Sequence, residues 1–235
     1  MNSSLSIPRS AILALVLFLT AQALCSQNST SASIPAYTIS PNGRYGVTVP
    51  HFDFEKSDTQ NDSNDLVDLK TSRTLTKIPQ EVCAYDRALN HHDSATPVWS
   101  ADSSLLLWRV NGKWFPDSYI LLRLNDGTIA WQLDLLKTAQ NEILRRTRKA
   151  VPKLYNKAKI SNAGNGSAYP EGFTIDVEAK EPLSLPLRIK VNLTANPKDI
   201  PDKPNLDSHM EAVIDPKGNF QVTDFALDDG PSPHF

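Results

Sequence analysis

The turn sequences within residues 97–136 limit the fold of this chain more than any other feature. Two of them, Asn111-Gly112 and Asn125-Asp126-Gly127, each separate one apolar run from the next. Asn-Gly and Asp-Gly pairs readily adopt the positive φ angles of a two-residue hairpin turn. The pattern therefore predicts several adjacent antiparallel strands.

Alternation within these strands predicts which side chains share a face. One face is expected to carry Leu106, Trp108 and Val110, then Ile120, Leu122 and Leu124, then Ile129, Trp131 and Leu133. The opposite face carries Leu105, Leu107, Tyr119 and Leu121, so we expect the sheet to be covered on both sides. The core is predicted to include Leu106, Trp108, Ile120, Leu122, Trp131 and Leu133.

The hydrophobic period changes from that of a strand to that of a helix near Asp134. An apolar side is formed by Leu136, Ala139, Ile143 and Ala150, and a basic side by Arg145, Arg148 and Lys149. Pro152 disfavours helical geometry at the residue before it but suits a first helical turn. We therefore predict a break at Val151 and a second helix through about Lys159.

Apolar and polar residues alternate again in four runs after residue 172, as in an antiparallel sheet with one solvated face. These runs are residues 173–177, 187–193, 211–214 and 220–222, with a turn at Asp215-Pro216-Lys217-Gly218 between the last two. The expected fold class is α+β, with antiparallel β-meanders, a central basic helical segment and a C-terminal antiparallel sheet.

The N-terminus has the features of a secretory signal peptide. Arg9 precedes the apolar run of residues 11–19, and Ala21 and Ala23 supply the small residues that a signal peptidase needs. That run is shorter than the roughly 20 residues of a membrane-spanning helix. We expect removal of residues 1–23, a secreted or periplasmic protein, and no transmembrane anchor.

The rest of the chain divides by composition. Residues 24–36 are rich in Ser and Thr and predict a flexible leader. Residues 37–133 form the predicted β-rich region, and residues 134–235 the helices and C-terminal sheet that pack with it. A hydrophobic content of 40% is enough for a core, and a net charge of −2 creates no chain-wide field for nucleic acid.

The two cysteines leave alternatives open. Cleavage after Ala23 keeps Cys25, whereas cleavage after Cys25 removes it, and lipidation of Cys25 is disfavoured by the bulky Leu24 before it. A retained Cys25 could pair with Cys83 in an oxidising compartment. Cys83 could equally be a lone buried apolar residue.

Part of the β-rich region resembles the blades of WD-repeat-like β-propellers. The resemblance rests on Ser40-Pro41-Asn42-Gly43-Arg44, Asp68-Leu69-Lys70-Thr71-Ser72 and Trp99-Ser100-Ala101-Asp102-Ser103-Ser104-Leu105. Asn42 replaces the usual aspartate, Ser72 the turn glycine and Ala101 the usual proline. The match covers about residues 38–133, room for two blades, whereas a closed propeller takes four to eight. The resemblance implies blade-like meanders and carries no functional residues.

No motif in the sequence assigns a catalytic site. His91-His92-Asp93 has residue types that bind metals, but lacks the spacing of a zinc site. Asp207-Ser208-His209 has the residue types of a triad, yet triads are assembled from separate segments. We predict no metal and no cofactor, and leave the catalytic residues unassigned.

Two features could form a binding surface. Residues 134–160 hold eight basic and two acidic residues, an excess of six positive charges, which either binds an anionic surface or is a solvated face. Trp114 and Phe115, beside a turn, are the aromatic candidates for a surface contact. The candidate binding residues are therefore Trp114, Phe115, Arg145, Arg148 and Lys149.

The leading hypothesis is an exported, non-catalytic binding protein. Its partner would be an anionic surface or another exported protein, and not nucleic acid. The alternative is a secreted hydrolase-like enzyme whose residues meet only in three dimensions. For that alternative the residues to inspect are His91, His92, Asp207 and His209.

Overall fold

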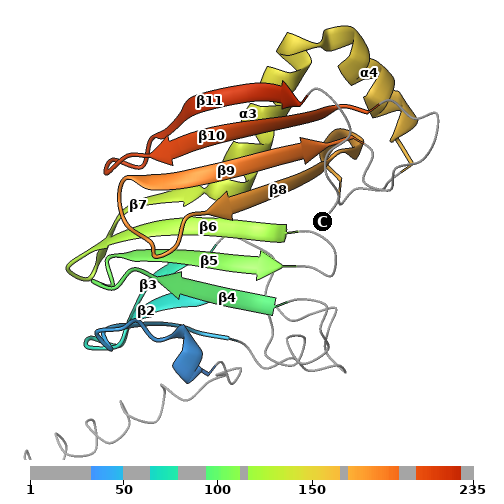
Figure 1. Cartoon of the computed structure of the whole chain (residues 1–235). Coiled ribbons are helices and arrows are strands. Elements are labelled where there is room, and N and C mark those ends of the chain that lie inside the picture. Colours follow the sequence, from blue (N-terminus) through green and yellow to red (C-terminus); the bar gives the residue numbers. More distant parts are fainter. Residues whose placement is uncertain are drawn as a thin grey trace, which may run out of the picture. The chain divides into compact units, whose positions relative to one another are not determined.

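The computed structural model describes residues 33–49, 64–78, 94–111, 116–164, 169–195 and 205–228. These residues form three antiparallel sheets and two helices, which is the expected α+β class (Figure 1). The strands are β1 (Tyr45–Val47), β2 (Asp65–Asp68), β3 (Arg73–Lys77), β4 (Ser94–Trp99), β5 (Leu105–Asn111), β6 (Pro116–Asn125), β7 (Thr128–Asp134), β8 (Thr174–Ala179), β9 (Leu187–Thr194), β10 (Asp207–Ile214) and β11 (Phe220–Asp228). The helices are α3 (Leu135–Ala150) and α4 (Pro152–Ser161).

The sheets follow the chain order, with strand orders β1-β2-β3, β4-β5-β6-β7 and β11-β10-β9-β8. Strands β3 and β4 were not predicted, and Pro97 lies in β4, an edge strand, where a missing backbone N–H is tolerated. Ser33 pairs with Val49, so the described structure begins before Tyr37, within the predicted leader. Asn111 ends β5, but Gly112 of the predicted turn, the signal peptide and both cysteines lie outside the described residues.

The sheet β4–β7 is buried on both faces, as predicted. Leu106 and Trp108 lie in one core with residues of β1, β2 and β3, and Trp108 has 0% of its surface exposed. Leu105 and Leu107 lie in a second core with α3, α4 and the C-terminal sheet. Successive residues of β5 therefore serve two different cores.

The prediction for Trp131 and Leu133 was wrong about the face. The pairing of β6 with β7 shifts between Arg123, which lies opposite Trp131, and Leu124, which lies opposite Ile129. This β-bulge leaves Ala130 as an extra residue and reverses the alternation beyond it. Ile129 packs against the first core, whereas Trp131 and Leu133 pack, half-buried, against the second.

A side-chain-capped turn precedes β1. The Ser40 hydroxyl donates to Asn42 Oδ1 at 2.8 Å and accepts a hydrogen bond from the Tyr45 amide at 3.0 Å. Gly43 has a φ of +69°, which glycine adopts without strain. The turn is thus closed by its own side chains.

A turn of the same design precedes β5. Here the Ser100 hydroxyl donates to Asp102 Oδ1 at 2.6 Å and accepts from the Leu105 amide at 2.8 Å. The amide of Asn42 in the first turn donates to Ser103 Oγ in the second at 3.0 Å. The two turns therefore join the first sheet to the second.

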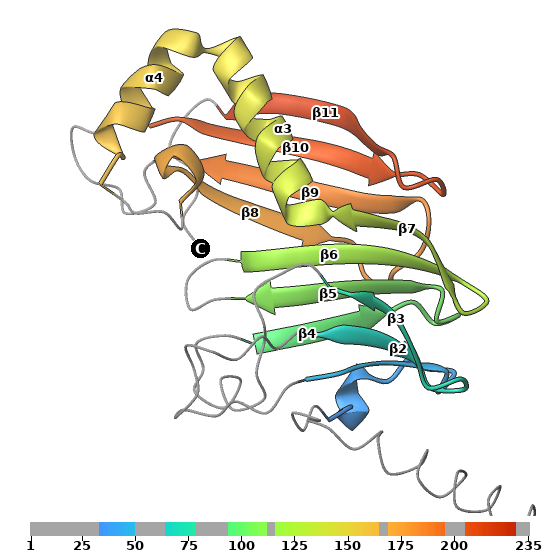
Figure 2. The ribbon, with the colours of Figure 1, turned by 180° about the vertical axis from the view of Figure 1, so that it is seen from behind.

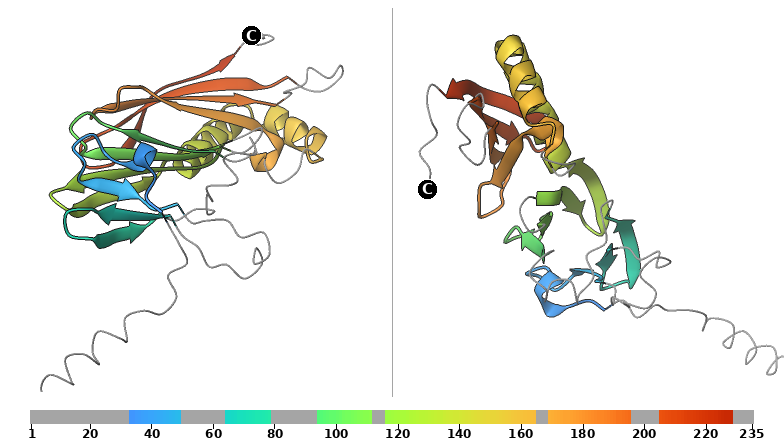
Figure 3. Two further views of the ribbon diagram at one scale, coloured as in Figure 1. Left: turned by 90° about the horizontal axis from the view of Figure 1, so that it is seen from below. Right: turned by 90° about the vertical axis from the view of Figure 1, so that its right-hand side faces the viewer.

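The helices lie where the periodicity predicted them. Asp134 caps α3 by accepting a hydrogen bond from the Lys137 amide at 3.0 Å, and Pro152 opens α4 after a break at Val151. Leu136, Ala139 and Ile143 are buried as predicted, while Ala150 at the helix end is exposed. Helix α3 lies along one face of the sheet β8–β11 (Figures 2 and 3).

The C-terminal sheet has the predicted alternation of buried and exposed residues. In β9, Leu187, Ile189, Val191 and Leu193 are buried towards α3, and the residues between them are exposed. Strand β10 begins at Asp207, inside a segment predicted to be a loop junction. The face of this sheet away from α3 remains open to solvent.

Replacing Trp108 with alanine tests the first core. Because the side chain is fully buried, we expect Trp108→Ala to lower the free energy of unfolding by about 3–5 kcal/mol, measured by denaturant titration. Trp131→Ala is the matched control and should cost less, since Trp131 is half-buried. Equal losses in the two variants would contradict this account of the two cores.

A second prediction concerns Asp102 and the stability of the fold at low pH. Hydrogen bonds from Ser100 and Ser104 lower the pKa of Asp102 from 3.8 to about 2. A lowered carboxyl pKa stabilises the fold at pH values above the unfolded pKa, and this contribution is lost as the pH falls through the folded pKa. Asp102→Asn should therefore remove the part of the acid sensitivity between pH 3.8 and about 2 in thermal unfolding. An unchanged pH dependence would refute it.

Candidate functional site

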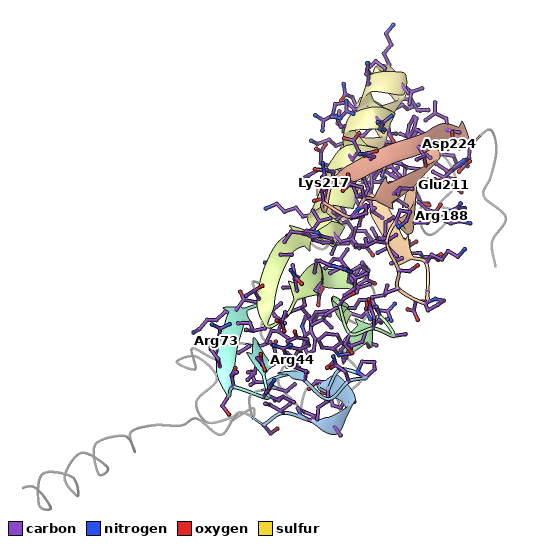
Figure 4. The ribbon with its side chains drawn as sticks, turned by 90° about the vertical axis from the view of Figure 1, so that its left-hand side faces the viewer. Arg44, Arg73, Arg188, Glu211, Lys217 and Asp224 are labelled. Carbon is purple, nitrogen blue, oxygen red and sulfur yellow. The ribbon has the colours of Figure 1, made fainter. Side chains whose placement is uncertain are left out.

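The open face of the sheet β8–β11 gathers charged side chains from neighbouring strands. Arg188 and Lys190 alternate with buried residues of β9, and Glu211 does so in β10. Figure 4 shows Arg188, Glu211 and Asp224 on successive strands, on the side of the sheet away from α3. We call this surface, with Lys180 and Lys190, the charged face.

The strand register places like charges beside each other on this face. The Lys180 amide donates to the Arg188 carbonyl at 2.9 Å, so these two basic residues are cross-strand neighbours. Toward the other edge of the same face, Glu211 of β10 lies opposite Asp224 of β11. Like charges in directly opposite positions destabilise a sheet. The face thus has a basic side, formed by Lys180 and Arg188, and an acidic side, formed by Glu211 and Asp224. The exposed residues of β8 itself, Asp176 and Glu178, are acidic, and Glu178 lies opposite Lys190.

A β-bulge shapes the acidic side. The pairing of β10 with β11 shifts between Glu211 and Ala212, which leaves Thr223 as an extra residue in β11. Both Thr223 and Asp224 are exposed as a result. Bulges often redirect side chains beside functional sites.

The charged face surrounds a hollow of about 680 Å³. Its lining comes from all four strands and from the residue after β8: Glu178, Ala179, Lys180, Arg188, Ile189, Lys190, Glu211, Ala212, Val213 and Thr223.

In the described parts of the chain, no ion pair joins Lys180, Arg188, Lys190, Glu211 or Asp224 to another side chain. Lys190 lies between Glu178 and Glu211 in the register without closing a bridge to either. Their charges are therefore available to a ligand.

The residues considered for catalysis separate in the structure. Ser208 is buried, with its hydroxyl 2.7 Å from Thr147 Oγ1, whereas His209 lies on the other face of β10. His209 Nδ1 is 2.7 Å from Asp228 Oδ1, a pair at the exposed edge strand. Asp207 begins β10, and His91 and His92 lie outside the described residues. Among the residues described, no group of three His, Cys, Asp or Glu side chains could hold a metal ion.

The predicted basic residues of the helices are largely paired with acids. Arg145 donates to Glu142 at 2.7 Å, and Arg148 to Glu171 at 2.5 Å, while Lys149 is exposed. Glu142 is one turn away in the same helix, but Glu171 comes from the 3-10 helix η2 (Pro170–Gly172) before β8. Trp114 and Phe115 lie outside the described residues.

Glu171 is the centre of a small network at the end of the helices. It also accepts hydrogen bonds from the Tyr155 hydroxyl at 2.9 Å and from Lys159 Nζ at 2.8 Å. Burial raises the pKa of Tyr155 to about 12, so the phenol stays protonated and donates. The network neutralises two of the cations that the sequence count had left unpaired.

Sequence reasoning missed the charged face as a site. Its residues were present in the predicted half-solvated strands, but alternation alone gives the face of a residue and not its cross-strand neighbour. The signal that could have found it is the succession of charges at alternate positions of residues 187–193 and 207–214.

No helix in the described residues is long and apolar enough to cross a membrane. No protein-family model and no curated protein sequence matches the chain. Among solved structures it is similar to a chain in "Complex structure of the fission yeast SREBP-SCAP binding domains", with 8% identity and a TM-score of 0.29. The alignment covers 98% of this chain and 45% of that one.

The like charges predict an unusual effect on stability. Asp224→Asn removes one of two facing carboxylates, so we expect the free energy of unfolding to rise by about 0.2–1 kcal/mol at low ionic strength. Salt should shrink the gain, because it screens exposed charges. A loss of stability in urea titrations would show that Asp224 supports the fold.

Proposed function

We propose that this chain is an exported binding protein whose charged face binds a polypeptide segment that carries both acidic and basic side chains. The observation that carries the proposal is the arrangement of charge: Lys180 beside Arg188, and Glu211 beside Asp224, with no ion pair between the described residues to neutralise them. A ligand with its acids over the basic side and its bases over the acidic side would relieve both repulsions.

The form of the surface supports a polymer as the ligand. The hollow lies along an open sheet face, whereas small-molecule sites usually enclose most of their ligand. Each strand adds charged or polar side chains along its length, so an extended segment could contact several of them in succession. We also propose that the chain is exported. The helical segment is proposed to be basic in character, and the binding of this ligand is assigned to a different surface.

A synthetic peptide in which a run of glutamates precedes a run of lysines tests the proposal. We expect it to bind the purified protein at low salt in fluorescence anisotropy, and more tightly than a peptide of the same composition with alternating charges. Arg188→Glu and Asp224→Lys should each weaken binding about tenfold or more, because each puts a repulsive charge on the face.

Lys217→Glu is the matched control. It changes the net charge as Arg188→Glu does, but Lys217 lies in the turn between β10 and β11, away from the hollow (Figure 4). It should alter affinity by no more than about twofold. An equal loss of affinity in Lys217→Glu would overturn the proposal, and so would the absence of binding at low salt. Tight binding of polyglutamate that is unchanged by Asp224→Lys would also overturn it.

A further inference from the structure

Helix α4 has an outer face that combines lysines with exposed aliphatic side chains. Lys153, Lys157 and Ile160 follow the spacing i, i+4, i+7, which puts them on one side of a helix. Tyr155 and Ala158 are buried on the other side. We define the outer face of α4 as Lys153, Leu154, Lys157 and Ile160.

The apolar residues of this face are unusually exposed. Ile160 has 77% of its surface exposed and Leu154 37%. In the described parts of the chain only four large hydrophobic side chains are exposed, the others being Tyr37 and Ile39. Two of the four therefore occur on one short helix.

The lysines of this face also have no acidic partner among the residues that the structure describes. Lys159, which lies towards Glu171, is bound to it at 2.8 Å. Among the described residues no acidic side chain forms an ion pair with Lys153 or Lys157. The positive charge of the helices that remains available on α4 is thus concentrated beside the exposed Ile160.

We infer that the outer face of α4 docks on an anionic phospholipid surface. Lysines attract acidic headgroups, and their aliphatic stems can lie along apolar surface while the ammonium groups stay in water. An exposed isoleucine on the same side of the helix can enter the boundary between headgroups and acyl chains, as in interfacial amphipathic helices. Figure 2 shows α4 at a corner of the C-terminal part, beyond the helix α3 that covers the sheet.

The chemistry favours lipid over a protein partner. Protein interfaces are depleted in lysine, and their binding energy is concentrated in Trp, Tyr and Arg. The outer face of α4 has none of those three. The arginines nearby, Arg145 and Arg148, are already held by Glu142 and Glu171.

Co-sedimentation with vesicles tests the inference. The protein should bind vesicles of phosphatidylcholine mixed with phosphatidylglycerol, should not bind phosphatidylcholine alone, and should lose binding as salt rises. The double variant Lys153→Gln, Lys157→Gln should reduce partitioning about tenfold or more. Ile160→Ser should reduce it by about fivefold, through loss of apolar contact.

Matched variants test whether binding depends on this face or on surface charge and apolar residues anywhere on the protein. Lys77→Gln with Lys217→Gln removes two exposed lysines elsewhere, and Tyr37→Ser removes another exposed apolar side chain; neither should change partitioning. The lysine variants should unfold at the wild-type midpoint, because the changed side chains are exposed.

Three results would overturn the inference. The first is equal binding to neutral vesicles, and the second is wild-type binding by the double lysine variant. The third is competition by polyglutamate together with no effect of Ile160→Ser, a result that would identify an acidic protein or polymer as the ligand. The charged face is independent of this surface. The double lysine variant should therefore bind the mixed-charge peptide as the wild type does.

Discussion

The burial of the sheet β4–β7 on both faces is the constraint on which the rest of the structure depends. Leu107 and Trp108 are consecutive, fully buried, and belong to different cores. A sheet of this kind is stable only if both sides are covered, because each exposed leucine or tryptophan would return a large apolar area to water. The N-terminal sheet covers one side, and the helices with the C-terminal sheet contribute to the core on the other. The inner face of the C-terminal sheet is used in this way, and its outer face is left open.

Polar contacts hold the N-terminal sheet β1–β3 in place on the sheet β4–β7. Arg44 Nη1 donates to Asp126 Oδ1 at 2.6 Å and Arg44 Nη2 lies 3.3 Å from Asp68 Oδ2, so one guanidinium joins β2 to the β6–β7 turn. The Gly127 amide of that turn donates to the Tyr45 hydroxyl at 2.9 Å. Asp126 and Gly127 have φ angles of +42° and +78°, as the hairpin sequence predicted. These contacts specify the arrangement that apolar packing alone would leave loosely defined.

Patterns within single segments could be read from the sequence, and relations between segments could not. The 3.6-residue period predicted α3, Pro152 predicted the break at Val151, and the alternation in residues 187–193 predicted β9. The bulges at Ala130 and Thr223 are properties of strand pairs, so the alternation of one strand could not reveal them. One bulge moved Trp131 to the other core, and the other bulge exposed Thr223 beside Asp224. The charged face itself depends on the register that sets Glu211 opposite Asp224, which no local pattern contains.

The helices illustrate why charge counts and charge availability differ. The count in residues 134–160 gave a broad basic segment, but Glu171 lies outside that window and accepts hydrogen bonds from both Arg148 and Lys159. A residue of another segment can therefore cancel cations that are far from it in sequence but adjacent in the fold. The same reasoning applies to the sheet, where Asp224 lies opposite the acidic Glu211 and Arg188 lies opposite Val213. Neither Arg188 nor Asp224 forms an ion pair with another described residue. In both places folding leaves some charges without an ion pair among the described residues, and a count over a sequence window does not identify which ones.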